Sequence, residues 1–369
     1  MTQKLDRRDF IRRLLTVSAA GAAWGLAGCG SRPTPNTATP TSPAATARAL
    51  PSTATVFPTS APPAERAATA ATTETAAKNP TVAPTVASTL TSAPAAPAAA
   101  YLAVARGAGA DPAELTRRAI AAVGGIEQFV KPGANVIIKP NICNAYHGPE
   151  YASTTNPEVV AAIVALCLGA GAKRVRVMDF AFGGSPQASY ETSGIAAAVK
   201  AAGGEMENMN RLKYNKTAIP QGKILKSSNI YKDILDADTV INVPIAKTHG
   251  SATLTLGMKN LMGVIQDRNA LHARGLHQCI ADLNSVVKPQ LTVVDAIRIL
   301  AANGPTGGNL DDVKRLDTII ASADVVAADA YATGLFGMKP ADVNYIKLGA
   351  GMGLGTMDLG NIKIEEINV

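Results

Sequence analysis

The sequence predicts an α/β protein whose mostly parallel sheet is flanked by helices and built from βαβ units. Between residues 101 and 369, short apolar runs that suit buried strands alternate with longer segments that open on helix-capping residues. Turns that contain glycine and proline separate the two kinds of segment. Strands that alternate with helices favour parallel pairing through right-handed crossovers. We therefore expect one large α/β domain in this part of the chain.

The first half of the domain shows the alternation most clearly. Residues 101–106 predict a strand, and Asp111 followed by Pro112 predicts the cap and the first position of a helix that ends near Val123. Residues 135–139 predict the next strand. The same criteria predict a polar loop at 140–156, a helix that begins after a cap at Asn156, strands at 174–179, 240–243, 291–295, 318–320 and 362–367, and helices at 187–202, 323–336 and 341–348.

Residues 1–29 have the composition of an export signal. Arg7 and Arg8 precede an uncharged run rich in alanine and glycine, which is typical of the twin-arginine type. The alternative is a basic amphipathic helix. The run ends in a segment that resembles a bacterial lipobox, in which Cys29 is lipidated and becomes the mature N-terminus. Cleavage that leaves Cys29 as a free thiol is the alternative. We expect the twin-arginine machinery as a partner and a lipid anchor on the outer face of the cytoplasmic membrane.

Residues 30–100 are expected to form a disordered tether. Nearly all of them are alanine, threonine, proline or serine. Such a composition buries too little apolar surface to offset the entropy lost on ordering. A coil of about seventy residues spans on the order of 45 Å root-mean-square, and more where proline stiffens it. We expect this segment to hold the domain at 101–369 away from a membrane.

Charge and cysteine content argue against two classes of function. The formal net charge is +7, and removal of residues 1–29, with five basic and two acidic side chains, lowers it to +4. This mild charge does not indicate a nucleic-acid-binding protein. Cys143, Cys167 and Cys279 are far apart in the sequence, so the chain has no cysteine cluster for an iron–sulfur centre. Twin-arginine export carries folded proteins and favours a bound cofactor, whose identity is unknown.

Short segments spread over the domain carry a resemblance to a known family. They are residues 130–133 with 138–141, 154–160, 243–263, 276–277 with 280–283, 303–308 and 324–330. Their content and order resemble the domain of unknown function 362, a family of bacterial and archaeal proteins. The resemblance covers nearly all of the predicted domain but implies no named activity. Some relatives have ferredoxin-like cysteine clusters, which this chain lacks.

Three lysines are the first candidates for ligand binding. Lys139 and Lys247 follow predicted strands, and Lys259 stands at a predicted helix start. Asn141 and Asn260 lie beside them in the same family motifs. Cations and amides at the ends of buried strands occupy the usual place of a ligand site in an α/β sheet. We expect these residues to bind a carboxylate or phosphate on a small anionic molecule; the alternative is solvated surface lysines.

One histidine and two aspartates are candidates for catalysis. Lys247 should depress the pKa of His249, which favours the neutral form that acts as a base or metal ligand. His249 and His277 with a carboxylate could bind a metal if the fold brings them together. Asp179 and Asp295 end buried strands and could act as base or ligand. The alternatives are histidines bound to the backbone and aspartates that cap helices or turns.

A glycine-rich loop and a buried acid complete the candidate set. The loop that begins at Asn303 and Gly304 could cradle an anion with its amides, or could simply connect two elements. Asp329 falls in an apolar helix pattern and needs a buried partner. Together the residues favour an enzyme that uses acid–base or metal-assisted chemistry on an anionic molecule. A non-catalytic ligand- or cofactor-binding lipoprotein and an envelope scaffold remain as alternatives.

Overall fold

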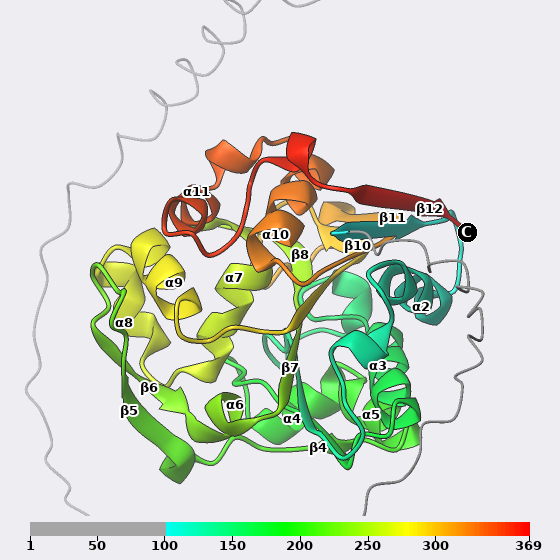
Figure 1. Cartoon of the computed structure of the whole chain (residues 1–369), viewed down its shortest axis with the longest axis horizontal. Coiled ribbons are helices and arrows are strands. Elements are labelled where there is room, and N and C mark those ends of the chain that lie inside the picture. The colour runs from blue at the N-terminus through cyan, green and yellow to red at the C-terminus, as the bar shows by residue number, and fades with distance from the viewer. Residues whose placement is uncertain (1–100) are drawn as a thin grey trace, which may run out of the picture. The chain divides into compact units, whose positions relative to one another are not determined.

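The computed structural model describes residues 101–369, which Figure 1 shows in colour. The predicted signal peptide, tether and lipidation site at Cys29 lie outside the described residues. The strands are β1 (Leu102–Arg106), β2 (Asn135–Pro140), β3 (Arg174–Val177), β4 (Glu205–Met206), β5 (Tyr214–Ala218), β6 (Ser227–Tyr231), β7 (Thr239–Val243), β8 (Ile245–His249), β9 (Thr253–Thr255), β10 (Leu291–Leu300), β11 (Val313–Ser322) and β12 (Ile364–Asn368). The α-helices are α2 (Pro112–Ala122), α3 (Pro157–Gly169), α4 (Pro186–Thr192), α5 (Ile195–Ala201), α6 (Lys232–Asp236), α7 (Gly257–Asn260), α8 (Arg268–Ala273), α9 (Leu276–Asn284), α10 (Val325–Thr333) and α11 (Asn344–Gly351).

Within these residues the main sheet has ten strands and is mostly parallel, which confirms the predicted fold class. Its order is β12-β1-β11-β10-β7-β2-β3-β4, and β8 and β9 extend it beside β10. The pairs β2–β3, β3–β4, β2–β7, β7–β10, β8–β10 and β1–β12 are parallel. Antiparallel pairing occurs where β11 joins β1 and β10, and where β9 joins β8.

Helices cover both faces of the sheet, as the prediction requires. In Figure 1, α2, α3 and α5 lie on one side of the central strands, and α7, α9, α10 and α11 lie on the other. The buried apolar side chains accordingly form two large clusters, one under each set of helices. No helix in residues 101–369 is both long and apolar enough to cross a bilayer.

Local sequence signals fix the starts of the first two long helices. The carboxylate of Asp111 accepts a hydrogen bond from the backbone N–H of Ala113 at 2.8 Å, at the N-terminus of α2. The side chain of Asn156 accepts one from Glu158 N at 2.8 Å, at the start of α3. Proline follows each cap at the first helical position. Both predicted caps are confirmed, because each satisfies an N–H that the helix leaves unpaired.

The structure corrects several predicted elements. The helix expected at 187–202 is two helices, α4 and α5, separated at Gly194, whose φ of 73° is left-handed. The strand expected at 291–295 continues to Leu300 and pairs along its length with β11. β1 and β2 are not neighbours in the sheet, because β1 pairs with β11 and β12.

Pro244 interrupts the central strand without ending it. The predicted strand at 240–243 ends before the proline, and β8 resumes pairing with β10 directly after it. The carbonyl of Pro244 accepts a hydrogen bond from Asp295 N at 2.8 Å, which keeps the chain against the sheet. Lys247 therefore lies within a strand, opposite Thr255 of β9. Proline removes one donor, and the strands on either side use their remaining backbone groups.

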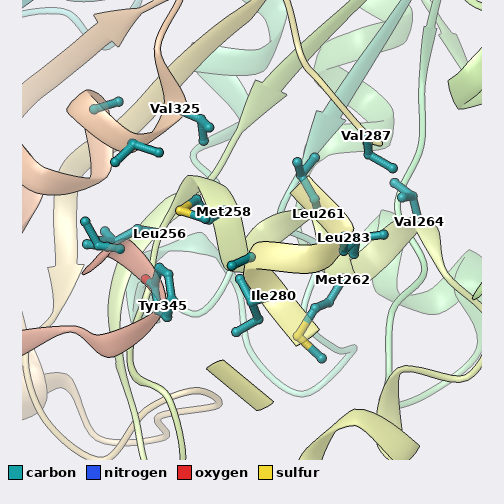
Figure 2. Close-up of a cluster of buried hydrophobic side chains, with 14 of the residues drawn as sticks. Leu256, Met258, Leu261, Met262, Val264, Ile280, Leu283, Val287, Val325 and Tyr345 are labelled. Carbon is teal, nitrogen blue, oxygen red and sulfur yellow. The ribbon is translucent and has the colours of Figure 1, made fainter. Parts of the chain in front are cut away.

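The segment that follows β9 is held by an apolar core. Figure 2 shows Met258 of α7 and Leu261 and Met262 of the adjoining 3-10 helix η4 (Leu261–Val264) among buried side chains. Ile280 and Leu283 of α9 belong to the same cluster. The polar residues of the segment, Lys259 and Asn260, are not part of this apolar cluster.

Candidate functional site

A cavity of about 260 Å³ lies where the carboxyl ends of β2 and β3 meet β8, β9, α7 and α8. This is the usual place for a ligand in an α/β sheet. Seven of the residues predicted from the sequence line it, namely Lys139, Asn141, Asp179, Lys247, His249, Lys259 and Asn260. The other five candidates in the described residues, Asp295, His277, Asn303, Gly304 and Asp329, do not line it.

Lys139 and Asp179 form a buried ion pair at one side of the cavity. Lys139 Nζ lies 2.7 Å from Asp179 Oδ1 and donates a hydrogen bond to Asn260 Oδ1 at 2.9 Å. Asp179 also accepts hydrogen bonds from the backbone N–H groups of Ile142 and Phe180. Burial lowers the pKa of Lys139, and the Asp179 carboxylate opposes that shift. Asp179 was predicted to be catalytic, yet its contacts make it the partner that holds Lys139.

Gly263 permits the close approach of this ion pair to η4. A β-carbon at this position would lie 2.1 Å from Asp179 Oδ1 and 2.6 Å from Lys139 Nζ. Both distances are far shorter than van der Waals contact, so any side chain here would displace the pair. Gly263 ends the family-like segment 243–263, but this role depends on tertiary contacts that the segment alone does not reveal.

A chain of hydrogen bonds runs from Lys247 through three asparagines. Lys247 Nζ donates to Asn141 Oδ1 at 3.0 Å and to the carbonyl of Ser153 at 2.6 Å. Asn141 Nδ2 donates to Asn260 Oδ1 at 2.9 Å, and Asn260 Nδ2 donates to Asn242 Oδ1 at 2.8 Å. These buried amides fix one another, so Asn141 and Asn260 act chiefly by orienting the two buried lysines.

Lys259 differs from the other lysines of the cavity. Its side chain is half-buried, and its amine makes no hydrogen bond or ion pair with any residue in 101–369. Burial lowers its pKa to about 7, and the positive charges of Lys247 and Arg268 add to the shift, whereas Cys143 opposes it. An ammonium that lacks an acceptor and stands near other cations attracts an anionic ligand.

The orientation of His249 corrects its predicted role as a base or metal ligand. Its Nδ1 accepts hydrogen bonds from the backbone N–H groups of Ser251 at 3.1 Å and Ala252 at 3.3 Å. A backbone N–H can only donate, so Nδ1 holds the lone pair and the neutral ring has its proton on Nε2. Burial and nearby Lys259 lower the pKa of His249 to about 3. His249 is therefore a neutral hydrogen-bond donor at Nε2.

His277 does not join His249 in a metal site. Its ring stacks on Tyr345, with ring centroids 6.1 Å apart, and it does not line the cavity. Residues 101–369 contain no group of three histidine, cysteine, aspartate or glutamate side chains placed to hold a metal ion. His249 instead stacks on His272, with ring centroids 6.0 Å apart.

Asp295 is a structural residue, which corrects its predicted catalytic role. Its carboxylate accepts hydrogen bonds from Asn156 N at 2.7 Å and from Ile297 N at 3.0 Å. The side chain is buried, and burial raises its pKa to about 6. Asp295 thereby anchors the residue that caps α3. This is the capping alternative that the sequence left open.

The loop that begins at Asn303 borders the cavity through Pro305. Asn303 Nδ2 donates to both carboxylate oxygens of Asp312, at 3.0 and 2.9 Å. Gly304 N donates to Thr248 Oγ1, and a β-carbon on Gly304 would lie 2.0 Å from the carbonyl oxygen of Thr248. Asn303 and Gly304 thus have protein partners and do not line this cavity, and their anion-binding role stays a prediction. Only Pro305 of this loop lines the cavity.

Sequence analysis missed Arg268 and two aromatic residues at the cavity wall. The guanidinium carbon of Arg268 lies 4.8 Å from the ring centroid of Phe180 and 5.8 Å from that of Phe182. Arg268 Nη1 also donates to the carbonyl of Phe180. α8 brings this arginine to the cavity from a segment that no quoted motif includes, so the sequence contained no signal for it.

Asp329 anchors the helix that carries Lys259. Its carboxylate accepts hydrogen bonds from Gly257 N at 2.6 Å and Met258 N at 2.9 Å. It is fully buried, and burial raises its pKa to about 8. A β-carbon on Gly257 would lie 2.7 Å from Asp329 Oδ1, so glycine is needed for this contact. The partner that the sequence required for Asp329 is thus the backbone of α7.

Comparison with known proteins places the chain in a family. Two solved structures match at TM-scores of 0.40 and 0.39: lactate racemase apoprotein from Thermoanaerobacterium thermosaccharolyticum (12% identity) and a protein from Thermotoga maritima (11% identity). The matches cover 60% and 62% of this chain but only 54% and 60% of those proteins. A thylakoid-associated protein of Synechocystis sp. is 29% identical over 229 residues, which are 60% of this chain and 68% of that protein. The model of the family described as domain of unknown function (DUF362) matches residues 136–334, more than half of the chain, and the chain belongs to that family.

Proposed function

We propose that the cavity binds a small anionic molecule through a carboxylate or phosphate group. Lys139, Lys247, Lys259 and Arg268 line it, and the only acidic residue among its lining is Asp179, which pairs with Lys139. An excess of positive charge in a half-enclosed site favours an anion, because the low dielectric strengthens the attraction. The amine of Lys259, which has no acceptor in residues 101–369, is the observation that carries this proposal.

Further donors support recognition of an anion. Lys247 uses two of its three N–H groups on Asn141 and Ser153, which leaves one for a ligand. Arg268 has five N–H groups and donates one to a backbone carbonyl. His249 offers Nε2–H. A cavity of about 260 Å³ is smaller than the range of roughly 300–1,000 Å³ for drug-sized ligands, and this favours a small metabolite.

Titration of the full chain with sodium sulfate, followed by calorimetry, tests the proposal. We expect Lys259→Gln to weaken sulfate binding by about tenfold or more, which corresponds to a loss of about 1.4 kcal/mol of binding free energy. The melting temperature should be nearly unchanged, because Lys259 has no protein partner to lose. The matched control is Lys347→Gln on the exposed side of α11, which should bind as the wild type does.

Two results would contradict the proposal. A wild-type chain that binds neither sulfate nor phosphate would remove the anion site. A large fall in melting temperature for Lys259→Gln would make Lys259 a structural residue instead.

We further propose that the domain is exported by the twin-arginine route and anchored through a lipid on Cys29. The basic n-region, the uncharged run and the cysteine that follows it support this, as does the description of the Synechocystis relative as thylakoid-associated. Mass spectrometry of the membrane-extracted protein should find a lipid on Cys29. A Cys29→Ala variant should leave the membrane fraction, and an unchanged distribution would contradict the anchor.

A further inference from the structure

The lysines of the cavity divide into those that are engaged and one that is not. Lys139 is paired with Asp179, and Lys247 donates to Asn141 and Ser153. Within residues 101–369, Lys259 has no acceptor. No protein group in the described residues engages the amine of Lys259, so this amine can contact a bound molecule directly and is also available to react with it.

We propose that Lys259 is a catalytic nucleophile that forms an imine with the carbonyl group of a small anionic substrate, of the class of 2-oxo acids. The proposal rests on the anion-binding function above and names the substrate class and the reacting atom of that site. The carboxylate is the anionic part that the cationic wall recognises. The adjacent carbonyl carbon is the part that Lys259 attacks.

The backbone that carries Lys259 is fixed from three directions. Asp329 holds the first two N–H groups of α7. Asn260 is held by hydrogen bonds with Lys139, Asn141 and Asn242. Met258 and Leu261, which flank Lys259 and Asn260 in the sequence, are packed in the apolar core that Figure 2 shows. Such a support places a reacting amine reproducibly, which catalysis by orientation requires.

The surroundings of Lys259 also keep its amine able to react near neutral pH. Lys247, Arg268 and Lys139 are the cations that act on it, and Cys143 is the one group with the opposite effect. Burial together with these charges lowers the pKa of Lys259 to about 7. An uncharged amine is the nucleophilic form, and a lysine beside other cations is a known way to produce it.

Two further groups suit the carbonyl oxygen. His249 lines the cavity and has its proton on Nε2, because its Nδ1 accepts hydrogen bonds from the amides of Ser251 and Ala252. Thr255, which also lines the cavity, is 3% exposed and its hydroxyl has no partner in the described residues. A buried hydroxyl without a partner is unfavourable unless a ligand or water completes it. Both can donate to the oxygen on which negative charge develops.

The reaction balances without any further reagent. The lone pair of Lys259 Nζ forms a bond to the carbonyl carbon while the C–O π bond breaks, and a proton passes from nitrogen to oxygen to give the carbinolamine. The hydroxyl then leaves with a second proton from nitrogen as water, and the C=N bond forms. No group is oxidised or reduced. When the nitrogen of this neutral imine takes up one proton from the solvent, the resulting iminium draws electrons from the adjacent carbon, which is the use of such an intermediate.

The test traps the imine on the full chain. Pyruvate and sodium cyanoborohydride are added at pH 7.5, and the reduced adduct is located by intact mass and peptide mapping. We expect one adduct per chain on Lys259. Acetone, an uncharged ketone, should label this residue at least several-fold less. The control variant Lys347→Arg should label as the wild type does.

Lys259→Arg separates this inference from anion binding. Arginine keeps the positive charge, so calorimetry should still show sulfate binding within a few-fold of wild type, but the adduct should disappear. Sulfate binding by the wild type without any adduct would overturn the imine and leave the anion site intact. Adducts spread over exposed lysines, or an undiminished adduct in Lys259→Arg, would also overturn it. If this variant does not fold, the peptide map of the wild type still decides the site of attachment.

Discussion

Two lysines in one cavity differ in how completely the protein satisfies their charge. Lys139 is 1% exposed and contacts a carboxylate, an amide oxygen and a backbone carbonyl. Lys259 is half-buried and contacts no acceptor in residues 101–369. Both amines lie near other cations, but in the described residues only the amine of Lys139 has hydrogen-bond acceptors. A buried charge is usually paired, because desolvation is otherwise too costly.

The contrast separates a structural role from a functional one. The hydrogen bonds of Lys139 hold Asp179, and through it the amides of Ile142 and Phe180, so this corner of the cavity is a support. The absence of an acceptor for Lys259 within the described residues lowers the stability of the folded protein. A bound anion in the cavity would supply the negative charge that Lys259 lacks. The four predictions below test this contrast.

Removal of Lys139 should have the largest effect on stability. Lys139→Met leaves Asp179 buried and uncompensated, and we expect a loss of about 3–5 kcal/mol in the free energy of unfolding. Denaturant unfolding measures this loss. Lys259→Met, by contrast, removes a charge that has no protein partner and should change the free energy of unfolding by no more than about 0.5 kcal/mol, or raise it.

A double variant sharpens this first prediction. Asp179→Asn in addition to Lys139→Met removes the stranded charge and keeps an acceptor for a backbone amide, so part of the lost stability should return. Equal stability losses for Lys139→Met and Lys259→Met would show that the two lysines do not differ as described.

Gly263→Ala should be the next most damaging change. Its β-carbon would lie 2.1 Å from Asp179 Oδ1, so the ion pair must move, and we expect a loss of about 1–3 kcal/mol. Gly250→Ala is the matched control, because nothing lies within 4 Å of a β-carbon there and its φ is not left-handed. Thermal unfolding compares the two variants. Similar melting temperatures would mean that the Lys139–Asp179 pair adjusts freely.

The pH dependence of anion binding tests whether the positive charge of Lys259 contributes to binding. The pKa of Lys259 is lowered to about 7, so its positive charge is present below that pH and lost as the pH rises through it. Sulfate stays charged throughout, and its affinity should be level below about pH 6 and fall by up to about tenfold per pH unit above about pH 8. A bound anion should raise the pKa of Lys259.

Calorimetry between pH 6 and 9 measures this profile, and buffers of different ionisation enthalpy report the proton taken up on binding. Lys259→Arg is the control, since arginine remains charged and its affinity should not change over the range. A wild-type affinity that is equally independent of pH would separate Lys259 from the anion.

Local signals made part of the fold and site predictable. The caps at Asp111 and Asn156 depend on neighbouring residues, and both were recognised. Lys139 lines the cavity from the carboxyl end of β2, as expected of a ligand site in a parallel sheet, whereas Lys247 reaches it from within β8. The parallel pairing of β2 with β3 was predictable from the alternation of strands and helices, whereas the antiparallel pairing of β1 with β11 depends on residues more than two hundred positions apart.

The roles within the site depended on tertiary contacts that the sequence does not show. Asp179 and Asp295 both end apolar runs, yet one pairs with Lys139 and the other anchors the cap of α3. The orientation of His249 is set by two backbone amides and not by any side-chain spacing. Arg268 reaches the cavity only because α8 folds over it.

The smallest expected effect concerns the hydroxyl of Thr255. It is buried and has no partner in the described residues, so Thr255→Val should leave the free energy of unfolding unchanged or raise it by about 1 kcal/mol. If the hydroxyl donates to a bound carbonyl oxygen, the variant should form the pyruvate adduct several-fold more slowly while sulfate binding is retained. This combination of equal or higher stability with slower reaction is the opposite of what Lys139→Met should show. Equal adduct rates in Thr255→Val and the wild type would exclude the hydroxyl from the reaction, and a marked loss of stability would reveal a structural partner for it.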